Sequence, residues 1–354
     1  MNAVEMIKFS DILYNSLVDD ISREIFEIRM QYALDRDIWK MRHKLMDIYE
    51  EPWIIPELDR LVNQYSDYKH IVIFGAGLYG KYVHRLLMHS KYKDEDILFC
   101  DNDPLKQKDY YDGVRVLSAN ELYTEYSDSI IIVAIAQNAE AVIRQLAQGG
   151  IFGKKVLISF KGILYALRGN QYFDCFAPIK DEVFVDCGCY NGATCNEFDK
   201  WTKGEFDKII SFEANPEFYE RCQKAIRKWS DRAKLVCAGT WDKPCEVRFI
   251  NDHSAGSKVS DKEGMAVRME SIDNVLEGEK ATFIKMDVEG SEYKSLEGAR
   301  KTIEKYRPRL AISIYHKPED IIELPYIIND IRDDYKYQLA QYMSDGDETV
   351  LYAY

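Results

Sequence analysis

Two short glycine-rich segments have the spacing of turns that bind nucleotides. The second, residues 186–192, reads Asp-Cys-Gly-Cys-Tyr-Asn-Gly and lies between an apolar run and a helical pattern. Glycines allow the backbone to approach a ligand closely. The carboxylate of Asp186 favours a cationic amino-acid group and would repel a diphosphate. The residues that we assign to this ligand-binding turn are Asp186, Gly188, Tyr190, Asn191 and Gly192.

An acidic residue follows the next predicted strand, over residues 208–212. Glu213 is placed to accept hydrogen bonds from both hydroxyl groups of a ribose. Asn215 and Pro216 then form a typical helix start, with Asn as the N-cap and Pro at the first helical position. We expect Glu213 and Asn215 to complete the nucleoside site that begins at the glycine turn.

A third polar segment contains Asp287 and Glu289, after a predicted strand over 282–286 and before a predicted helix over 291–305. His316 follows another predicted strand, over 309–314. Because ligands bind beyond the carboxyl ends of parallel strands, we expect these three side chains to meet at one edge of a sheet. Our hypothesis is that His316 is a general base. Asp287 and Glu289 would orient it or the acceptor, or would hold a divalent cation with it. Asp287 is also a candidate cofactor-binding residue, whereas Glu292 is interpreted as a charge that stabilises the helix start.

The first glycine-rich segment has the pattern G-x-G-x-x-G, formed by Gly75, Gly77 and Gly80. It lies between a predicted strand over 70–74 and a predicted helix over 79–89, and Asp101 ends the next strand. This arrangement is typical of a turn that binds phosphate, with an acid for the ribose. We predict a second, nucleotide or nucleotide-sugar site here. Complete NAD-dependent chemistry and a scaffold without a ligand stay open as alternatives.

The pattern of elements predicts an α/β protein with two parallel sheets. Residues 1–66 have helical spacing of apolar residues, 67–162 predict a small Rossmann-like domain, and 163–354 predict a second α/β domain. The turn at 344–348 is too short for a parallel connection, so the last two strands must be antiparallel. A parallel sheet that ends in an antiparallel hairpin is typical of class I methyltransferases.

Composition excludes several classes of protein. The chain of 354 residues has a formal net charge of −13, which disfavours binding to nucleic acid. The longest apolar run, 130–136, is too short to span a bilayer, and the N-terminus lacks the pattern of a signal peptide. We therefore expect cytoplasmic residence and reduced thiols for the eight cysteines.

Residues 181–354 resemble the FkbM family of methyltransferases. Three blocks match: Val-Asp-x-Gly-x-x-x-Gly at 185–192, Ser-Phe-Glu-Ala-Asn-Pro at 211–216, and Ile-Lys-Met-Asp-Val-Glu-Gly-Ser-Glu at 284–292. The resemblance implies a Rossmann-like methyltransferase fold, S-adenosyl-L-methionine as the methyl donor, and O-methylation of sugars or natural-product hydroxyls. In the first block, Cys187 and Cys189-Tyr190 depart from the usual Asp-Val-Gly-Ala-Asn of the family.

Two other functions stay open. The protein could act through Gly75–Gly80 as a nucleotide-sugar-binding or NAD-dependent protein, or it could be a noncatalytic regulator that binds S-adenosylmethionine. For the methyltransferase, we expect a small-molecule or glycan acceptor and no transmembrane segment. The N-terminal helices are a candidate surface for forming an oligomer.

Overall fold

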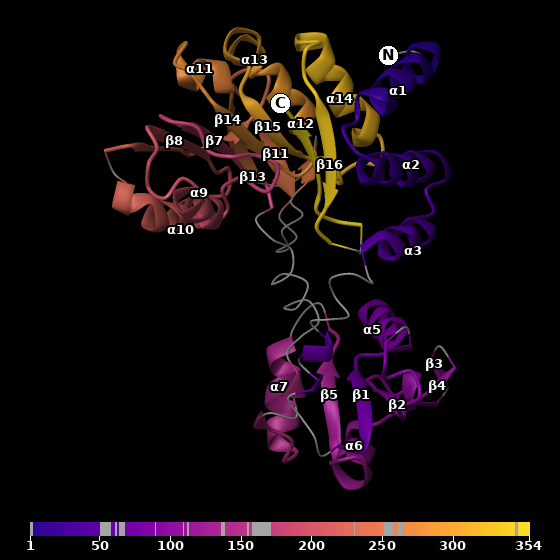
Figure 1. The fold of residues 1–354 in the computed structure, drawn as a ribbon. Helices are drawn as coiled ribbons and strands as arrows, with labels where there is room; N and C mark the ends of the chain where they lie inside the picture. Colours follow the sequence, from indigo (N-terminus) through magenta and orange to yellow (C-terminus); the bar gives the residue numbers. More distant parts are fainter. Residues whose placement is uncertain are drawn as a thin grey trace. The chain divides into compact units, whose positions relative to one another are not determined.

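The structure is a computed structural model that describes residues 3–49, 58–60, 62–63, 68–88, 90–108, 110–111, 113–135, 139–153, 156–157, 171–229, 231–250, 258–260, 265–343 and 346–354. The chain forms two compact units. Unit 1 combines residues 1–45 with 170–354, and unit 2 consists of residues 46–169. Figure 1 shows the helices and strands of both units.

The main sheet of unit 1 has seven strands in the order β16-β17-β15-β14-β7-β8-β9. All neighbours are parallel except the pairs that include β17, which is antiparallel to both β15 and β16. The predicted terminal hairpin is therefore confirmed. The strands are β7 (Val183–Cys187), β8 (Lys208–Phe212), β9 (Ala233–Val236), β14 (Phe283–Met286), β15 (Arg309–Ser313), β16 (Tyr337–Gln341) and β17 (Thr349–Ala353).

The strand order reverses between β7 and β14. From β7 the chain moves outward through β8 to β9, and it then returns to β14 on the other side of β7. Right-handed crossovers place the helices of the two halves on opposite faces of such a sheet. Ligands of open α/β sheets bind where the order reverses, beyond the carboxyl ends of the strands. The ends of β7 and β14 are therefore the expected place for a ligand.

Helices surround this sheet, and one of them differs from the sequence prediction. The single helix predicted over 291–305 is two helices, separated at Gly298, where a Cβ atom would collide with the backbone oxygen of Trp241. The helices of unit 1 after residue 170 are α9 (Ala193–Trp201), α10 (Pro216–Ile226), α11 (Ile272–Leu276), α12 (Glu292–Glu297), α13 (Arg300–Tyr306) and α14 (Asp320–Ile331), with a 3-10 turn at Arg227–Trp229.

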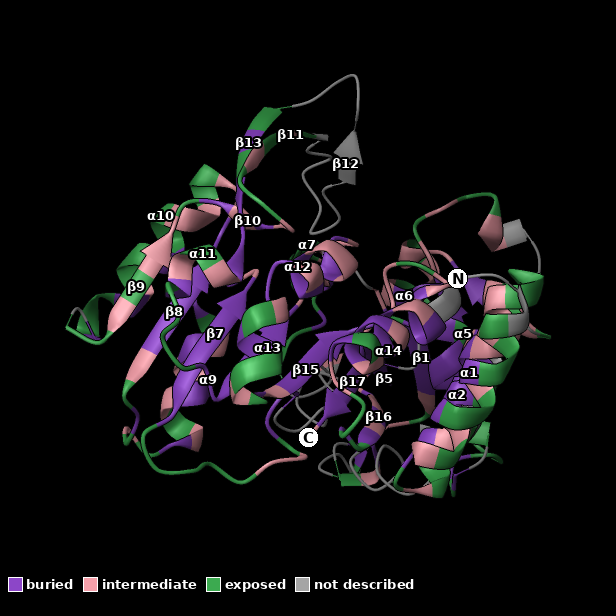
Figure 2. Ribbon diagram, turned by 90° about the horizontal axis from the view of Figure 1, so that it is seen from above, coloured by how far each residue is buried: buried purple, intermediate pink, exposed green. Residues whose placement is uncertain are grey.

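The core of unit 1 is aromatic. Phe184 on β7 stacks on Phe198 of α9, with ring centroids 4.5 Å apart, and Phe283 on β14 joins them. Figure 2 shows β7, β8 and β15 as buried strands, whereas α10 and α13 present exposed outer faces. Burial of large aromatic side chains between the sheet and its helices is the main source of stability for this layered arrangement.

A second, four-stranded sheet occupies part of the stretch between 239 and 281 that the sequence analysis left without assigned elements. Its order is β10-β13-β11-β12, and only β10 and β13 are parallel to each other. Two of its strands, β10 and β12, have only two and three residues and are too short to give an alternation signal, whereas β11 and β13 have six residues each. They are β10 (Gly239–Thr240), β11 (Cys245–Ile250), β12 (Lys258–Ser260) and β13 (Met265–Glu270).

The N-terminal helices pack on the edge of the main sheet in unit 1. They are α1 (Ala3–Ser16), α2 (Asp20–Asp35) and α3 (Ile38–Tyr49). Figure 1 shows α1 and α2, in indigo, beside the yellow β16 and α14. The N–H of Val18 donates to the carbonyl of Tyr337, and the hydroxyl of Ser22 contacts both backbone polar groups of Leu339. These contacts satisfy the open edge of β16, which would otherwise be free to pair with another chain.

Unit 2 contains a six-stranded sheet in the order β3-β4-β2-β1-β5-β6. Its strands are parallel except for the β3–β4 pair, which confirms the smaller α/β domain predicted before the methyltransferase-like part. Of the helix that the sequence predicts over 57–65, only residues 58–60 and 62–63 are described, and 58–60 and 62 are helical. Part of the turn at 344–348 lies outside the described residues. The elements of unit 2 are β1 (His70–Phe74), α5 (Leu78–Met88), β2 (Ile97–Cys100), β3 (Tyr110–Tyr111), β4 (Val114–Leu117), α6 (Ala119–Glu125), β5 (Ser129–Val133), α7 (Ala139–Gln148) and β6 (Val156–Leu157), with a 3-10 turn at Lys106–Lys108.

The helices of the described part are all too short or too polar to cross a membrane.

Replacing Ser22 tests whether α2 stabilises the edge of the sheet. Ser22→Ala removes the partner of the Leu339 N–H, at an N–O distance of 2.9 Å, and leaves a buried backbone group unpaired. We expect a loss of about 1–3 kcal/mol in the free energy of unfolding, measured by urea unfolding followed through tryptophan fluorescence. The control is Ser10→Ala, because the Ser10 hydroxyl only contacts a carbonyl of its own helix. Equal effects of the two substitutions would contradict the prediction.

Candidate functional site

The ends of β7 and β14 meet at Gly188. This residue has φ = 79°, and a Cβ atom there would collide with the backbone oxygen of Asp287. The N–H of Asp287 in turn donates to the carbonyl of Cys187, with an N–O distance of 3.1 Å. Only glycine meets both the steric and the conformational requirement at this position. The predicted glycine turn and the predicted acidic segment are therefore brought into direct contact.

A buried ion pair joins the same two strands. The Nζ atom of Lys285 lies 3.1 Å from Oδ1 of Asp186, and the two side chains are 2% and 0% exposed. Lys285 also donates to the backbone oxygens of Cys187 and Gly188, at 3.2 and 2.8 Å. Burial alone would lower the pKa of Lys285, but the charges of Asp186 and Asp287 outweigh it and raise that pKa. Lys285 is therefore charged, and it holds the glycine turn in place through its hydrogen bonds to the carbonyls of Cys187 and Gly188.

This pairing bears on the role predicted for Asp186. The carboxylate is buried against Lys285, and the thiol of Cys195 lies 3.4 Å from its Oδ2. An acid in this position fixes the turn through Lys285. Direct contact between Asp186 and the cationic end of a ligand stays a prediction.

The rest of the turn is organised around Glu213. The N–H of Tyr190 donates to Oε2 and the N–H of Asn215 to Oε1, both at 2.8 Å. Each carboxylate oxygen has two lone pairs, so one acceptor position per oxygen remains for a hydroxyl group. Burial raises the pKa of Glu213. The carboxyl group is only 7% exposed and ends β8 at the edge where β7 ends.

The other assigned residues of the turn have local roles in the described structure. Tyr190 has φ = 51° and is 45% exposed, with its ring 4.4 Å from that of Phe218 between centroids. Gly192 is the N-cap of α9 with φ = 78°, and the Asn191 side chain accepts from the N–H of Ala193. Asn215 caps α10 as predicted, through a 2.9 Å hydrogen bond from the N–H of Glu217.

The cysteines of the turn are packing residues. Cys187 and Cys189 are both buried, and Sγ of Cys189 lies 2.9 Å from Sγ of Cys222 on α10. The eight cysteines are free thiols in this structure. Burial raises the pKa of Cys189 to about 12, so its thiol stays protonated. The two cysteines in this departure from the usual family sequence are thus changes in the core beneath the turn, whereas Tyr190 is exposed.

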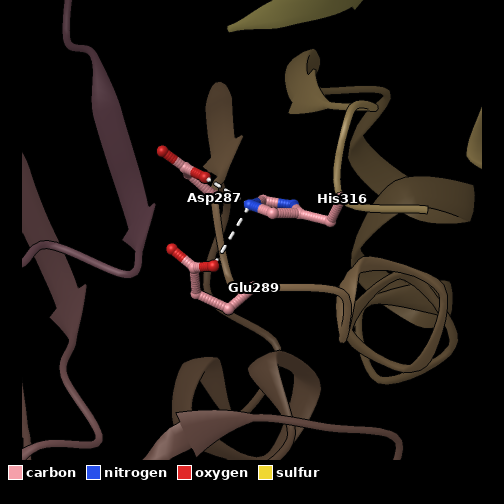
Figure 3. Close-up of side chains that lie close together, drawn as sticks. All are labelled: Asp287, Glu289 and His316. Atoms are coloured by element: carbon pink, nitrogen blue, oxygen red, sulfur yellow. Dashed lines mark ion pairs between the residues drawn. The ribbon is translucent and has the colours of Figure 1, made fainter. Parts of the chain in front are cut away.

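The second part of the site is the cluster of Asp287, Glu289 and His316, which Figure 3 shows converging from two strand ends. The Nε2 atom of His316 lies 3.4 Å from Oδ1 of Asp287 and 3.5 Å from Oε2 of Glu289. One ligand atom from each residue lies within 4.8 Å of the others, close enough to share a metal ion. The sequence prediction that these three residues meet agrees with this geometry, whereas their catalytic roles stay predictions.

Neighbouring side chains fix the cluster. The hydroxyl of Tyr172 donates to Oδ2 of Asp287 at 2.9 Å, and that of Tyr315 lies 3.3 Å from Oδ1. Glu289 begins the turn between β14 and α12 with φ = 55°. The Nδ1 atom of His316 lies 2.9 Å from Oε1 of Glu292. Glu292 is therefore more than a helix-start charge, because it orients the imidazole ring.

The cluster has an excess of negative charge. Burial alone would lower the pKa of His316, but Glu292, Asp287 and Glu289 outweigh it and raise that pKa to about 10. Burial raises the pKa of Glu289 to about 7. Burial alone would raise the pKa of Asp287, but the charges of Lys285 and His316 hold that pKa below its usual value. His316 is thus protonated at neutral pH unless another positive charge enters, and an imidazolium ion cannot accept a proton.

The glycine turn of unit 2 is described by itself. Gly75 has φ = 115°, and a Cβ atom at Gly80 would collide with the Gly75 oxygen, so both glycines are needed for the turn to close. At Gly77, by contrast, a Cβ atom would meet nothing within 4 Å. The Asp101 carboxylate accepts from the N–H of Ala76 at 2.8 Å and pairs with Lys106 at 3.0 Å. The four predicted residues thus converge on one turn, and whether it binds a ligand stays a prediction.

Two family models match the chain. Residues 186–339 match the methyltransferase FkbM domain, and residues 70–144 match the PglD N-terminal domain. The first match confirms the predicted family resemblance for the second α/β domain. No curated protein matches the chain.

Several solved structures are similar to this chain. A methyltransferase FkbM from Methylobacillus flagellatus KT is 20% identical, with 90% of this chain and 100% of that chain covered and a TM-score of 0.46. An rRNA methylase from Streptococcus thermophilus is 16% identical, with coverage of 50% and 87% and a TM-score of 0.33. A fibrillarin from Aeropyrum pernix, with natively bound S-adenosyl-L-methionine, is 10% identical, with coverage of 55% and 74% and a TM-score of 0.34.

Replacing Lys285 tests the buried ion pair. Lys285→Met leaves the Asp186 carboxylate buried without its partner, so we expect a loss of about 3–5 kcal/mol in the free energy of unfolding. The matched control, Lys208→Met, breaks a more exposed pair with Glu279 and should cost about 0–1 kcal/mol. The double variant Asp186→Asn, Lys285→Met should recover part of the loss. Urea unfolding measures all three, and similar midpoints for the two single variants would refute the assignment.

Proposed function

We propose that the methyltransferase FkbM domain of residues 186–339 transfers a methyl group from S-adenosylmethionine to a hydroxyl group of a sugar, glycan or natural-product acceptor. The observation that supports this most is the meeting of Gly188 and Asp287 where the strand order reverses. It brings the candidate nucleoside turn and the acid–base cluster to one edge of the sheet. A methyl donor and an acceptor need this proximity for an in-line displacement.

The residues around Glu213 fit the proposed cofactor. Its two carboxylate oxygens each have one backbone donor and one remaining acceptor position, which suits the pair of hydroxyls of a ribose. The exposed ring of Tyr190 stands beside them as an apolar surface for the base. Gly188, Asn191, Gly192, Asn215 and Asp287 complete the proposed cofactor site. S-adenosylmethionine supplies a methyl group activated by its sulfonium charge.

The chain's own residues handle the acceptor. An alcohol oxygen attacks the methyl carbon, the carbon–sulfur bond breaks with its electron pair going to sulfur, and the hydroxyl proton must leave. A base within hydrogen-bond reach promotes this step. We assign proton removal to the cluster of Asp287, Glu289 and His316. His316 can serve as the base only when another cation balances the surrounding carboxylates, since its pKa is otherwise about 10.

Replacing His316 tests the catalytic part of this proposal. His316→Ala should lower methyl addition by about 10²–10⁴-fold and leave affinity for S-adenosylhomocysteine nearly unchanged, because the ring lies outside the nucleoside turn. The affinity is measured by calorimetry on the full chain. Methyl addition is measured by mass spectrometry of small glycans and lipid-linked sugars in cells with the wild-type protein, the variant, or neither. The matched substitution His70→Ala, in unit 2, should leave methyl addition intact.

Two results would contradict the proposal. Absence of S-adenosylhomocysteine binding by the wild-type chain would refute the cofactor assignment and favour a protein that acts through unit 2. Binding without any methyl group that depends on the protein would favour the noncatalytic regulator.

We also propose that unit 2 binds a nucleotide or nucleotide sugar at the Gly75–Gly80 turn. The specific support is the open position of Gly77 within a turn whose other glycines are sterically required. The match of residues 70–144 to the PglD N-terminal domain agrees with a role connected to sugars. A nucleotide sugar in unit 2 and a glycan acceptor in unit 1 would both belong to carbohydrate chemistry. NAD is the alternative ligand for the same turn.

Replacing Gly77 separates ligand binding from folding in unit 2. Gly77→Ala adds a methyl group to open space, so stability should be retained. We expect the affinity for UDP-N-acetylglucosamine, used as the probe, to fall at least about tenfold, because the backbone could no longer approach a diphosphate. Calorimetry on the full chain gives the affinity, with NAD as a parallel probe and S-adenosylhomocysteine binding as the control. Unchanged affinity for the probe, or no binding by the wild type, would refute this site.

A further inference from the structure

The imidazole of His316 has two different environments. Its Nδ1 atom lies 2.9 Å from Oε1 of Glu292, within the range of a charge-assisted hydrogen bond. Its Nε2 atom lies 3.4 and 3.5 Å from the Asp287 and Glu289 oxygens, beyond that range for both. Two carboxylates therefore face one ring nitrogen, and both lie farther from it than a charge-assisted hydrogen bond requires. An arrangement held together only by ion pairs would bring at least one of them nearer.

The ring nitrogen that faces the carboxylates is buried and unsatisfied. The His316 side chain is 9% exposed, and neither ring nitrogen has a hydrogen-bond partner of good geometry among the described residues, although Nδ1 lies 2.9 Å from Oε1 of Glu292. Figure 3 shows this nitrogen pointing between Asp287 and Glu289. A buried polar atom without a partner costs about 1–3 kcal/mol. A partner between these side chains would interact with a ring nitrogen and two carboxylate oxygens at once.

The spacing of the three atoms fits a shared metal ion. Metal–nitrogen and metal–oxygen bonds of about 2.0–2.2 Å, at the angles of tetrahedral or octahedral coordination, separate two ligand atoms by about 3.0–3.5 Å. The two distances from Nε2 fall in this range. The ligand atoms of the three residues also all lie within 4.8 Å of one another.

The surrounding contacts resemble those that support metal ligands. A ligating histidine commonly donates its other N–H to a carboxylate, which fixes the tautomer and the orientation of the ring. Glu292 stands in that position at Nδ1. Ligating carboxylates are in turn held by hydrogen bonds, as Asp287 is by the hydroxyl of Tyr172. The three ligand atoms are thus arranged before any ion binds.

We propose that Asp287, Glu289 and His316 bind a divalent first-row transition-metal ion. One imidazole and two carboxylates suit ions such as Mn²⁺, Fe²⁺ or Zn²⁺ better than Mg²⁺ or Ca²⁺, which favour oxygen ligands alone. Three protein ligands leave coordination positions open, as catalytic sites require. Glu292 is a positioning residue for the histidine ligand.

The role of the ion rests on the proposed function, although its binding does not. A cation at this place would stabilise the alkoxide form of an acceptor hydroxyl, which lowers the pKa of that hydroxyl. His316 would then act as a metal ligand. Proton removal from the acceptor hydroxyl would depend on the ion and on carboxylate oxygens of Asp287 and Glu289 that do not bind it. An alcohol acceptor must be activated by a base or by a metal ion, and the cluster could supply either.

Titration with Mn²⁺ tests the site without requiring activity. Manganese is chosen as the probe because the free cysteines of the chain, which bind zinc, are poor ligands for it. The full chain, first treated with a chelator that is then removed, should bind one Mn²⁺ per chain, as measured by the loss of the free-ion signal in electron paramagnetic resonance. Zn²⁺ should displace it, and Mg²⁺ should compete at least about tenfold more weakly.

Variants identify the ligands. Glu289→Ala and His316→Ala each remove a ligand atom and should weaken Mn²⁺ binding by more than about 100-fold, whereas Glu292→Gln, which disturbs only ring orientation, should weaken it by about 10–100-fold. Glu304→Gln is the matched control, because this residue is exposed on α13. Circular dichroism verifies that each variant is folded.

The outcomes separate this inference from the proposed function. Absence of saturable Mn²⁺ binding, or binding that Glu289→Ala and His316→Ala leave unchanged, overturns the metal site. S-adenosylhomocysteine binding is measured on the same samples in the presence of chelator. A chain that binds Mn²⁺ as expected but not S-adenosylhomocysteine retains the metal site and loses the proposed function. The reverse result removes the metal site alone.

Discussion

The buried pair of Lys285 and Asp186 is the interaction on which the organisation of the site depends. It joins the two central strands at the point where the strand order reverses, and Lys285 also binds the carbonyls that lead into the glycine turn. A buried charge is costly unless it is paired and hydrogen-bonded, so both partners are constrained to one arrangement. The turn at Gly188, the position of Asp287 and the separation of the two candidate binding regions all follow from that arrangement.

Charge balance links this pair to the cluster above it. Lys285 lowers the pKa of Asp287, while Glu289 and Glu292 face the same imidazole as Asp287 does. The local excess of carboxylates must be neutralised by a proton on His316 or by an ion. Sequence patterns indicate which residue types end each strand, but they do not indicate the net charge of the side chains that meet around His316. The hypothesis of His316 as a simple base came from residue types alone and needs the additional cation.

Much of the fold could be predicted because buried parallel strands are continuous apolar runs. The strands at 70–74 and 208–212 match the prediction at both ends, and the hairpin followed from the short turn before β17. Two strands of the second sheet, β10 and β12, have only two and three residues and give no alternation signal. The sheet was nevertheless missed at β11, whose six residues alternate apolar and polar side chains and could have indicated a strand. The helix expected over 291–305 is broken at Gly298, where close contact with Trp241 comes from a distant part of the chain.

The site was predicted in outline because strand ends are easy to locate. Lys285 was not assigned a role, because a lysine within an apolar strand has ordinary explanations. Glu292 was interpreted only as a charge at a helix start, and its contact with His316 was missed. One signal was available for Lys285. It occupies the position before the last residue of its strand, as Asp186 does in β7, and the two are register partners. Opposite charges at matching positions of two buried strands indicate a pair.

The covering of β16 by α2 has a consequence for how the chain folds during synthesis. Residues 1–45 are made first, yet the strand edge that they cover lies near residue 339, after the whole of unit 2. Domains generally fold as units while the chain emerges, so unit 2 can form while the N-terminal helices still lack their partner. Closing so long a loop is slow. The N-terminal helices must therefore remain soluble, or be protected by a chaperone, until the last strands of unit 1 have been made.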